Sequence, residues 1–581
     1  MNRCSRKQWA QGMAFLLCLL AALSGCAPRK SDPIRSGWSR GLPVAETEVG
    51  EAPTLAIAPT GRWLVWTGQA DGDTTFFLSR VDPMGHVTAP SPIPLALDYP
   101  HAPRLFATPN GFSLFFLART APGRYRIFVQ PLDAHGAPTG AAIPVSPAEQ
   151  GVDAYAVGTT LTGFMLVWNA VDAGEWAQAL DEEGIPLGPP LHLAERGGAP
   201  ALAVDGDGWT HVIWLSTPGY ERRELMYAKL SADAALAMPP CPLWGGNVSL
   251  GAVFSAPTVA LDTRWLYALV SVEYRSGLKQ GATETHVVAA PLAAPDRAEP
   301  FLLSLPEEFP EEYPYSWEGL PLVPLPPQGA HRATDTHTPV AFPGQRDHAL
   351  VAVGVKVSDG RRSEVQPAVV ALKDGAIVGW CPLANTTGWS ISPQLRPSPD
   401  GWHAVWSDMH GYGAYRIYYA TTAPAERAVL NRVEMADVLH MLLTVLSGFV
   451  SGLTMIPLFL MAAVPGLLLV VGHYVFGGEG DLHTWTARIL LVLGLSPYVL
   501  LKILFTAGLV PTMPFAAWFS SGLARSLALS LPFGLLLVDG GALALYWRRS
   551  QEPGLLPAWA LFVGVDIALT LLVVGPLIAG A

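Results

Sequence analysis

Two carboxylates in the C-terminal part of this 581-residue chain lie in apolar stretches, where an ionised side chain is energetically costly. Asp539 and Asp566 each lie near the middle of a long apolar stretch. If these stretches are antiparallel neighbours in a membrane, the two side chains lie at similar depth. One interpretation is a site coupled to protons or cations. The other is a protonated carboxyl group that ties helices together by a hydrogen bond.

A second set of carboxylates is scattered through the first 430 residues, at Asp153, Glu175, Asp262 and Asp408. Enzymes that cleave glycans use two facing carboxylates, and nothing in the spacing of these four selects a pair. Sequence motifs of zinc proteases, zinc ribbons, nucleotide-binding loops and nucleophile elbows are absent. We therefore expect no assigned catalytic residue, no metal ligand and no cofactor, and enzymatic activity stays an open alternative.

An acidic and aromatic segment within residues 304–336 is the third candidate. Its polar and aromatic residues are Glu307, Glu308, Glu311, Glu312, Tyr313, Tyr315 and Trp317. The density of proline predicts that the segment forms no regular strands. Long loops on rigid scaffolds often carry function, so we interpret it as a recognition loop. A solvated excursion without function is the alternative.

The elements that would position these residues recur about every fifty residues. The units begin at Pro53, Pro103, Asp153, Pro200, Pro257, Pro339 and Pro393. Each unit contains short apolar runs separated by Gly, Asp and Pro turns, and the second run often ends in tryptophan, as in Leu64-Val65-Trp66. This pattern is typical of four short strands per unit. We predict a seven-bladed β-propeller over residues 41–430, with six or eight blades as alternatives.

The last unit lacks a run that corresponds to a fourth strand. Residues 42–46, ahead of the first unit, match the fourth-strand pattern of Ile93-Pro94-Leu95. We therefore predict that this N-terminal strand completes the last blade and closes the ring, which removes its exposed edges.

Three turns between first and second strands contain proline and glycine at the same spacing. They are Ala58-Pro59-Thr60-Gly61, Thr108-Pro109-Asn110-Gly111 and Ser398-Pro399-Asp400-Gly401. The last one leads into an apolar strand that ends in Ser407-Asp408, and it resembles the repeat of TolB-like propellers. The resemblance implies a propeller used for binding, and it implies no catalytic residue.

The N-terminus has the layout of a secretory signal, with Arg3, Arg6 and Lys7 ahead of an apolar run. Leu23-Ser24-Gly25-Cys26 resembles a bacterial lipobox. The resemblance implies that residues 1–25 are removed, that Cys26 carries a diacylglycerol, and that residues 26–40 form a linker. An ordinary signal or an uncleaved anchor with a chance cysteine is the alternative.

The chain becomes strongly apolar after residue 436, and we predict an all-α transmembrane domain over residues 437–581. The candidate spans are 437–456, 458–476, 486–508, 526–547 and 556–579. Their lengths favour five spans. Four spans would place Arg548 and Arg549 inside the cell, as the distribution of basic residues prefers.

The formal net charge is −11 and no basic stripe is present, which argues against a nucleic-acid partner. We predict a binding or sensing scaffold for an envelope protein or glycan. It would sit in a bacterial cell membrane with an extracytoplasmic propeller. The alternatives are a propeller-type glycan hydrolase or lyase, and the receptor part of a transport component that uses Asp539 and Asp566.

Overall fold

The chain forms two compact units in the computed structural model, and each is described by itself. One unit comprises β-strands and covers residues 36–358 and 363–432. The other is helical and begins at residue 433. The structure describes residues 36–579 except 220–221, 248–250, 307–309, 311–312, 314, 326–334, 343, 359–362, 436, 440–455 and 508–520. Cys26 and the signal segment therefore lie outside the described residues.

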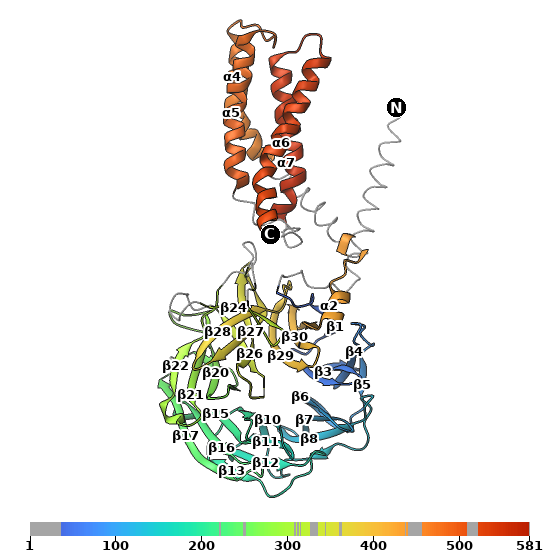
Figure 1. Ribbon diagram of the computed structural model, residues 1–581, viewed down its shortest axis with the longest axis vertical. Helices are drawn as coiled ribbons and strands as arrows, with labels where there is room; N and C mark the ends of the chain where they lie inside the picture. Colours follow the sequence, from blue (N-terminus) through green and yellow to red (C-terminus); the bar gives the residue numbers. More distant parts are fainter. Residues whose placement is uncertain are drawn as a thin grey trace. The chain divides into compact units, whose positions relative to one another are not determined.

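The β unit is a seven-bladed propeller whose sheets follow one another around a ring (Figure 1). Blades 1 to 3 each have four antiparallel strands in chain order. Blade 1 consists of β2 (Thr54–Ala58), β3 (Gly61–Ala70), β4 (Asp73–Val81) and β5 (Ser91–Ile93). Blade 2 consists of β6 (Asp98–Thr108), β7 (Gly111–Ala121), β8 (Arg124–Leu132) and β9 (Ile143–Pro144). Blade 3 consists of β10 (Val152–Thr160), β11 (Gly163–Ala170), β12 (Gly174–Leu180) and β13 (Leu191–Ala194).

Blades 4 and 5 keep this plan, although the inner strand of blade 5 is interrupted. Blade 4 consists of β14 (Pro200–Val204), β15 (Thr210–Gly219), β16 (Arg222–Leu230) and β17 (Leu236–Asn247). In blade 5, two short strands, β18 (Ala252–Phe254) and β19 (Thr258–Leu261), both pair with β20 (Trp265–Tyr274). β21 (Thr283–Pro291), the short 3-10 helix η1 (Pro295–Arg297) and β22 (Glu299–Leu302) complete the blade.

Blade 6 has six strands. Its regular part consists of β25 (Thr336–Ala341), β26 (Ala349–Ser358), β27 (Ser363–Lys373) and β28 (Ala376–Pro382). Two strands from the proline-rich insertion, β23 (Tyr315–Trp317) and β24 (Leu320–Pro324), extend the sheet beyond β28. The prediction that this insertion forms no regular strands is therefore wrong. Its prolines are tolerated because each half of β24 pairs on one side only, residues 320–322 with β23 and residues 323–324 with β28, so not every backbone N–H group is needed for pairing.

The insertion also contributes to the core of the propeller. Trp317 is buried, and its ring centroid lies 6.3 Å from that of Trp402 in blade 7. Tyr313 packs against the same apolar cluster. Glu307, Glu308, Glu311 and Glu312 lie outside the described residues, and Tyr315 is placed only as part of β23. A recognition role for this segment therefore stays a prediction.

Blade 7 joins the two ends of the propeller sequence. β29 (Trp389–Ser398), β30 (Gly401–Gly411) and β31 (Ala414–Thr421) are followed in the sheet by β1 (Leu42–Thr47), which pairs antiparallel with β31. The short helix α2 (Pro424–Leu430) follows β31. The predicted closure by an N-terminal strand is thus observed.

Tryptophans of the second strands fill the space between blades. Trp66, Trp168, Trp214 and Trp406 are all buried, and each belongs to an apolar cluster with residues of a neighbouring blade. The first strands of adjacent blades contact one another in most positions around the ring, for example β2 with β6 and β2 with β29. The first strands therefore surround the ring axis.

Four long helices lie in the described part of the second unit. They are α4 (Ile456–Val475), α5 (Trp485–Ala507), α6 (Ser521–Arg549) and α7 (Leu555–Ala579). α4 and α5 approach so closely that position 466 requires glycine. A Cβ at Gly466 would lie 1.9 Å from the carbonyl oxygen of Gly494. Most of the first predicted span, 437–456, lies outside the described residues.

Membrane spanning stays a prediction for this unit. By length and composition, only the segment Trp485–Ile503 is apolar enough to cross a membrane among the helices that the structure describes, and one such helix is weak evidence. The apolar segments Phe459–Val475 and Leu555–Leu571 are shorter.

Ring closure yields the first testable prediction. Replacing residues 42–46 by a Gly-Ser segment of equal length should lower the stability of the propeller in the full-length protein by about 3 kcal/mol or more. Each lost pairing hydrogen bond contributes about 1 kcal/mol, and the edge of β31 becomes exposed. Chemical denaturation followed by tryptophan fluorescence measures this. Unchanged stability would show that the β1–β31 pairing does not hold the ring together.

Candidate functional site

No direct contact joins the four scattered carboxylates in the part of the chain that the structure describes. Asp153 is exposed at the start of β10, and Asp262 lies in the turn between β19 and β20, where it accepts a hydrogen bond from Tyr267. Glu175 in β12 and Asp408 in β30 are buried in different blades. No hydrogen bond or ion pair joins any two of the four within the described chain.

The buried carboxyl groups of Glu175 and Asp408 each accept a hydrogen bond. One oxygen of Glu175 accepts the backbone N–H of Gly198 at 2.8 Å, and Asp408 accepts a hydrogen bond from Ser390 at 2.5 Å. Burial raises the pKa of Glu175 to about 8 and that of Asp408 to about 6, and these hydrogen bonds oppose the shift. Glu175 is therefore largely protonated in the folded protein at pH 7.

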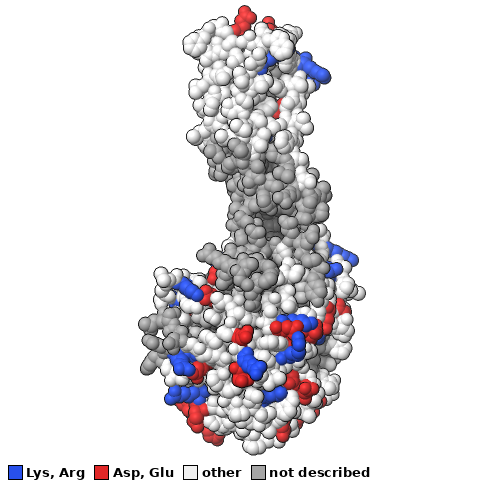
Figure 2. All heavy atoms as spheres, turned by 60° about the vertical axis from the view of Figure 1, so that its left-hand side comes forward, with Lys and Arg blue, Asp and Glu red and all other residues white. Residues whose placement is uncertain are grey.

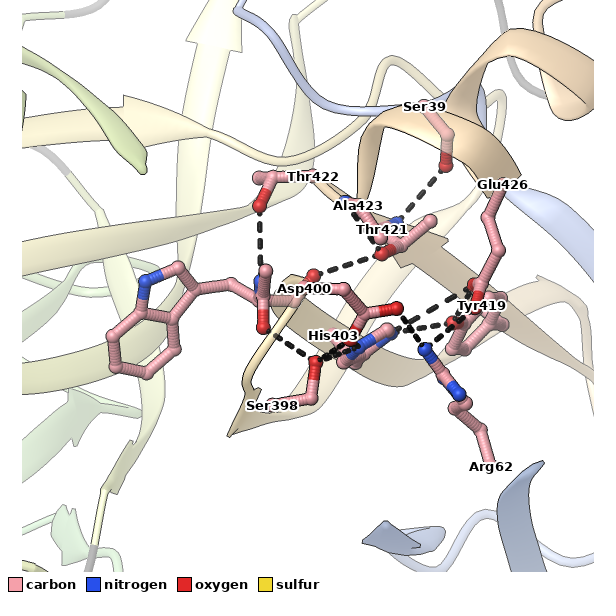
Figure 3. A network of polar contacts seen from close by, with 12 residues as sticks. Ser39, Arg62, Ser398, Asp400, His403, Tyr419, Thr421, Thr422, Ala423 and Glu426 are labelled. Atoms are coloured by element: carbon pink, nitrogen blue, oxygen red, sulfur yellow. Dashed lines mark hydrogen bonds and ion pairs between the residues drawn. The ribbon is translucent and has the colours of Figure 1, made fainter. Parts of the chain in front are cut away.

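A network of polar side chains lies where blades 1 and 7 meet α2 (Figure 3). Arg62 at the start of β3 contacts Asp400 at 2.5 Å and Glu426 of α2 at 2.8 Å. Glu426 also accepts a hydrogen bond from the Tyr419 hydroxyl at 2.7 Å. Arg62 and Glu426 are almost fully buried, so this charged group links the first blade to the last.

His403 belongs to the same network. Its Nδ1 lies 2.6 Å from the Tyr419 hydroxyl, and its Nε2 lies 2.7 Å from the Ser398 hydroxyl. Burial, and secondly the charge of Arg62, lower the pKa of His403 to about 3, so the imidazole is neutral. A serine beside a histidine can indicate a nucleophile and its base.

Blade 4 repeats this geometry without the serine, which argues for a structural role. There His211 contacts the Tyr227 hydroxyl at 2.9 Å and Asp205 at 3.0 Å. In both blades the histidine is near the start of the second strand and the tyrosine follows sixteen residues later. The sequence contained this spacing, but only the hairpin register shows that the two rings meet. We interpret both networks as ties between a hairpin turn and the next strand.

Two arginines on inner strands form a different kind of site. Arg104 of β6 and Arg396 of β29 belong to blades 2 and 7, and β2 of blade 1 contacts both strands. Both side chains are partly buried. Arg104 donates to the carbonyl oxygen of Pro103 at 3.0 Å, and Arg396 to that of Leu395 at 3.1 Å. Neither arginine forms an ion pair with a described carboxylate.

The positive charges of these two arginines act on each other. Burial, followed by the charge of Arg104, lowers the pKa of Arg396 to about 10. The charges of Arg104 and Glu51 also act on the Tyr155 side chain of β10. Glu51 already accepts hydrogen bonds from Thr67 at 2.5 Å and from the backbone N–H of Ala102 at 2.9 Å. Arg104 and Arg396 are therefore close enough, on inner strands, for their charges to interact, and we call them the axial arginine pair.

The backbone is strained near this pair. Ala102, Thr338 and Ser392 have φ angles of 54°, 42° and 49°, which side chains with a Cβ rarely adopt. Each stands directly before the leading proline of its unit, and the strand pairing shifts register there. Such bulges and strained residues gather at functional sites. Alignment of the units could have shown Arg104 as unusual, since Thr54 and Thr258 occupy the same place after proline.

The helical unit brings the two predicted carboxylates together and adds a residue that the sequence analysis missed. Asp566 in α7 pairs with Lys502 of α5 and accepts a hydrogen bond from Tyr498 at 2.6 Å. Asp539 in α6 is also fully buried, and Asp566 and Lys502 are close enough to act on its charge. Lys502 is a single charge within a long apolar run, which the sequence alone did not mark as a partner.

Comparison with known proteins finds no family match. No family model matches the chain, and no curated protein matches it. Solved structures with a similar arrangement include a protein of unknown function from Dyadobacter fermentans, with 11% identity, 66% of this chain and 98% of that chain covered, and a TM-score of 0.35. Polysaccharide lyase Uly1 has 10% identity, coverages of 64% and 89%, and a TM-score of 0.38.

An α-L-arabinofuranosidase from Lactobacillus brevis is also similar, at 11% identity. Its coverages are 43% of this chain and 92% of that chain, and the TM-score is 0.29. At such low identities and TM-scores, nothing about the function of this chain follows from these matches.

The network between blades 1 and 7 predicts the effect of Arg62→Met. Glu426 would be left buried without its cation, so we expect a loss of about 3–5 kcal/mol in the free energy of unfolding. Arg416→Met is the matched control, because Arg416 pairs with the largely exposed Glu46, and should cost about 0–1 kcal/mol. Urea denaturation of the full-length protein measures both. Equal losses in the two variants would contradict the assignment.

The raised pKa of Glu175 predicts a pH-dependent stability. The unfolded chain loses this proton near pH 4.5 and the folded chain near pH 8, so stability falls between these values, by at most about 1.4 kcal/mol per pH unit. Glu175→Gln has no proton to lose and should melt at a higher temperature than the parent at pH 8, with a smaller difference at pH 5. The control is Glu183→Gln, an exposed acid of the same blade. A difference that does not change with pH would refute the shift.

Proposed function

We propose that the propeller is a receptor for an anionic ligand, which it binds at the ring axis through the axial arginine pair. We also propose that the helical unit holds it in a bacterial membrane with the propeller outside the cytoplasm. The observation that carries the binding proposal is the presence of two neighbouring arginines, on inner strands, without a carboxylate partner among the described residues.

Two guanidinium groups held together repel each other, and partial burial increases this cost. A bound carboxylate or phosphate would relieve the repulsion and accept several charge-assisted hydrogen bonds at once. Glu51, whose charge acts on Tyr155 as that of Arg104 does, is already hydrogen-bonded to Thr67 and Ala102. An external anion is therefore the partner that best fits the pair.

The position of the two ends of the propeller sequence supports an anchored receptor. Ser39 bonds to the backbone of Thr421, Arg40 bonds to Asn431 at 2.7 Å, and Arg427 bonds to Gly37 at 2.5 Å. The chain thus enters and leaves the propeller beside α2, where the turns between first and second strands lie. The inner strands begin on the opposite face, where Ala102 and Ser392 are strained. Both ends of the propeller sequence are therefore attached away from the strained starts of these inner strands.

The surface of the helical unit supports the membrane part of the proposal. Figure 2 shows charged side chains spread over the propeller, whereas the described surface of the helical unit carries few of them. Large apolar side chains are exposed along its helices, including Met461, Leu468, Val492, Leu500 and Leu537. Exposed apolar surface of this extent is unusual in a soluble monomer.

A glycan hydrolase or lyase was the alternative from the sequence. The geometry does not favour it, because the four carboxylates considered for it are distributed over blades 3, 5 and 7, and Glu175, Asp262 and Asp408 are each hydrogen-bonded to other residues.

The proposal is tested by melting the full-length protein with sodium polygalacturonate, with inorganic phosphate, or with glucose as a neutral control, all at one ionic strength. A ligand that binds the folded state raises the melting temperature as its concentration increases. The polygalacturonate and phosphate arms distinguish a carboxylate-bearing glycan from a phosphate ligand.

Arg104→Gln and Arg396→Gln should each weaken anion binding roughly tenfold or more, because each removes a charge-assisted hydrogen bond. Arg124→Gln, at an exposed position of blade 2, is the control and should bind as the parent does. Anion-induced stabilisation that persists unchanged in the double variant, or that no anion produces, would overturn the proposal.

A further inference from the structure

The buried polar cluster of the helical unit contains one positive and two potentially negative groups. Lys502, Tyr498, Asp539 and Asp566 come from three helices and are all at most 2% exposed. Asp566 is satisfied by Lys502 and by Tyr498. Neither carboxylate oxygen of Asp539 has a hydrogen-bond partner among the described residues. The two carboxylates therefore have very different surroundings.

The charges of this cluster do not balance if both carboxylates are ionised. One ammonium group would face two carboxylates, which leaves an unpaired negative charge among buried side chains. A single proton restores neutrality. Asp566 is the carboxylate held in its ionised form, because it accepts from both the lysine and the tyrosine. Asp539 is the one left to take the proton, and in that state its hydroxyl can donate to Asp566.

A metal ion would balance the charge less well. No group of three or more His, Cys, Asp or Glu side chains that could hold a metal ion occurs in the described part of the chain. The ammonium group of Lys502 already occupies the position of a cation beside Asp566.

We propose that Asp539 is a proton-binding site of the helical unit, formed by its unpaired buried carboxyl group facing the Lys502–Asp566 ion pair. Protonation leaves one ion pair and one neutral donor. Release of the proton places a second negative charge against Asp566, so the packing of α6 on α5 and α7 depends on whether the proton is bound.

The sequence around Asp539 allows α6 to respond. Gly540 and Gly541 follow it directly, and a Cβ at either position would meet no atom within 4 Å. Close packing therefore does not require glycine there. Consecutive small residues are places where helices bend, so α6 can bend beside the carboxyl group when its charge changes.

Infrared spectroscopy of the full-length protein in phosphatidylcholine vesicles tests the proposal, with aspartate labelled by carbon-13. The parent should show the C=O band of a protonated aspartic acid at pH 7, and Asp539→Asn should lose it. Asp481→Asn is the matched control, since Asp481 is an exposed aspartate of the same unit, and it should retain the band. A parent protein without this band between pH 5 and pH 8, or with a band that Asp539→Asn retains, would overturn the proposal.

The Asp566→Asn variant tests whether Asp539 keeps its proton because of the charge of Asp566 or because of burial alone. Without the charge of Asp566, Asp539 becomes the only carboxylate beside Lys502 and should ionise, so the band should disappear although Asp539 is still present. Circular dichroism establishes that each variant keeps its helices, and this second variant supplies the test if Asp539→Asn fails to fold. A band unchanged in a folded Asp566→Asn protein would show that the ion pair does not control the proton.

Discussion

The pairing of β1 with β31 is the contact on which the rest of the propeller depends. Each blade buries both faces of its sheet against neighbours, so an open ring would expose the faces of two blades and the edge of β31. The N-terminal strand supplies the fourth strand of blade 7, and Arg62 and Glu426 tie blade 1 to the helix that follows the same blade. Apolar residues of blades 1 and 7 share one buried cluster in the closed ring.

The architecture of the propeller was predictable because its signals are local. Leading prolines, glycine turns and tryptophans at the end of second strands mark the units, and each of these features acts within a few residues. Counting them predicts seven units, with six or eight as alternatives, and the match of residues 42–46 to a fourth-strand pattern predicts the closing strand; the structure has seven sheets and this closure. The insertion was misjudged because proline density was taken to exclude strands, whereas the outer edge of blade 6 accepts β24 with Pro321 and Pro324.

The candidate sites were harder to predict because they depend on contacts between distant parts of the chain. Arg104 and Arg396 are almost three hundred residues apart, and only the order of blades around the axis brings their charges together. His403 and Tyr419 meet through the register of one hairpin. Asp539 and Asp566 were recognisable as costly charges, but Lys502 became their partner only through the packing of α5 against α7.

Closure by the N-terminal strand also imposes an order on folding. Glu46 and its partner Arg416 are 370 residues apart, so β1 is synthesised long before the strand it pairs with. Ribosomes make the chain from the N-terminus at about 5–20 residues per second, and β1 must wait for roughly twenty seconds or more. Blades 1 to 6 can form one by one during that time, whereas the last blade cannot. The final step is a long-range contact of the kind that slows folding. A chain truncated before residue 414 would expose an open, adhesive array of sheets to chaperones.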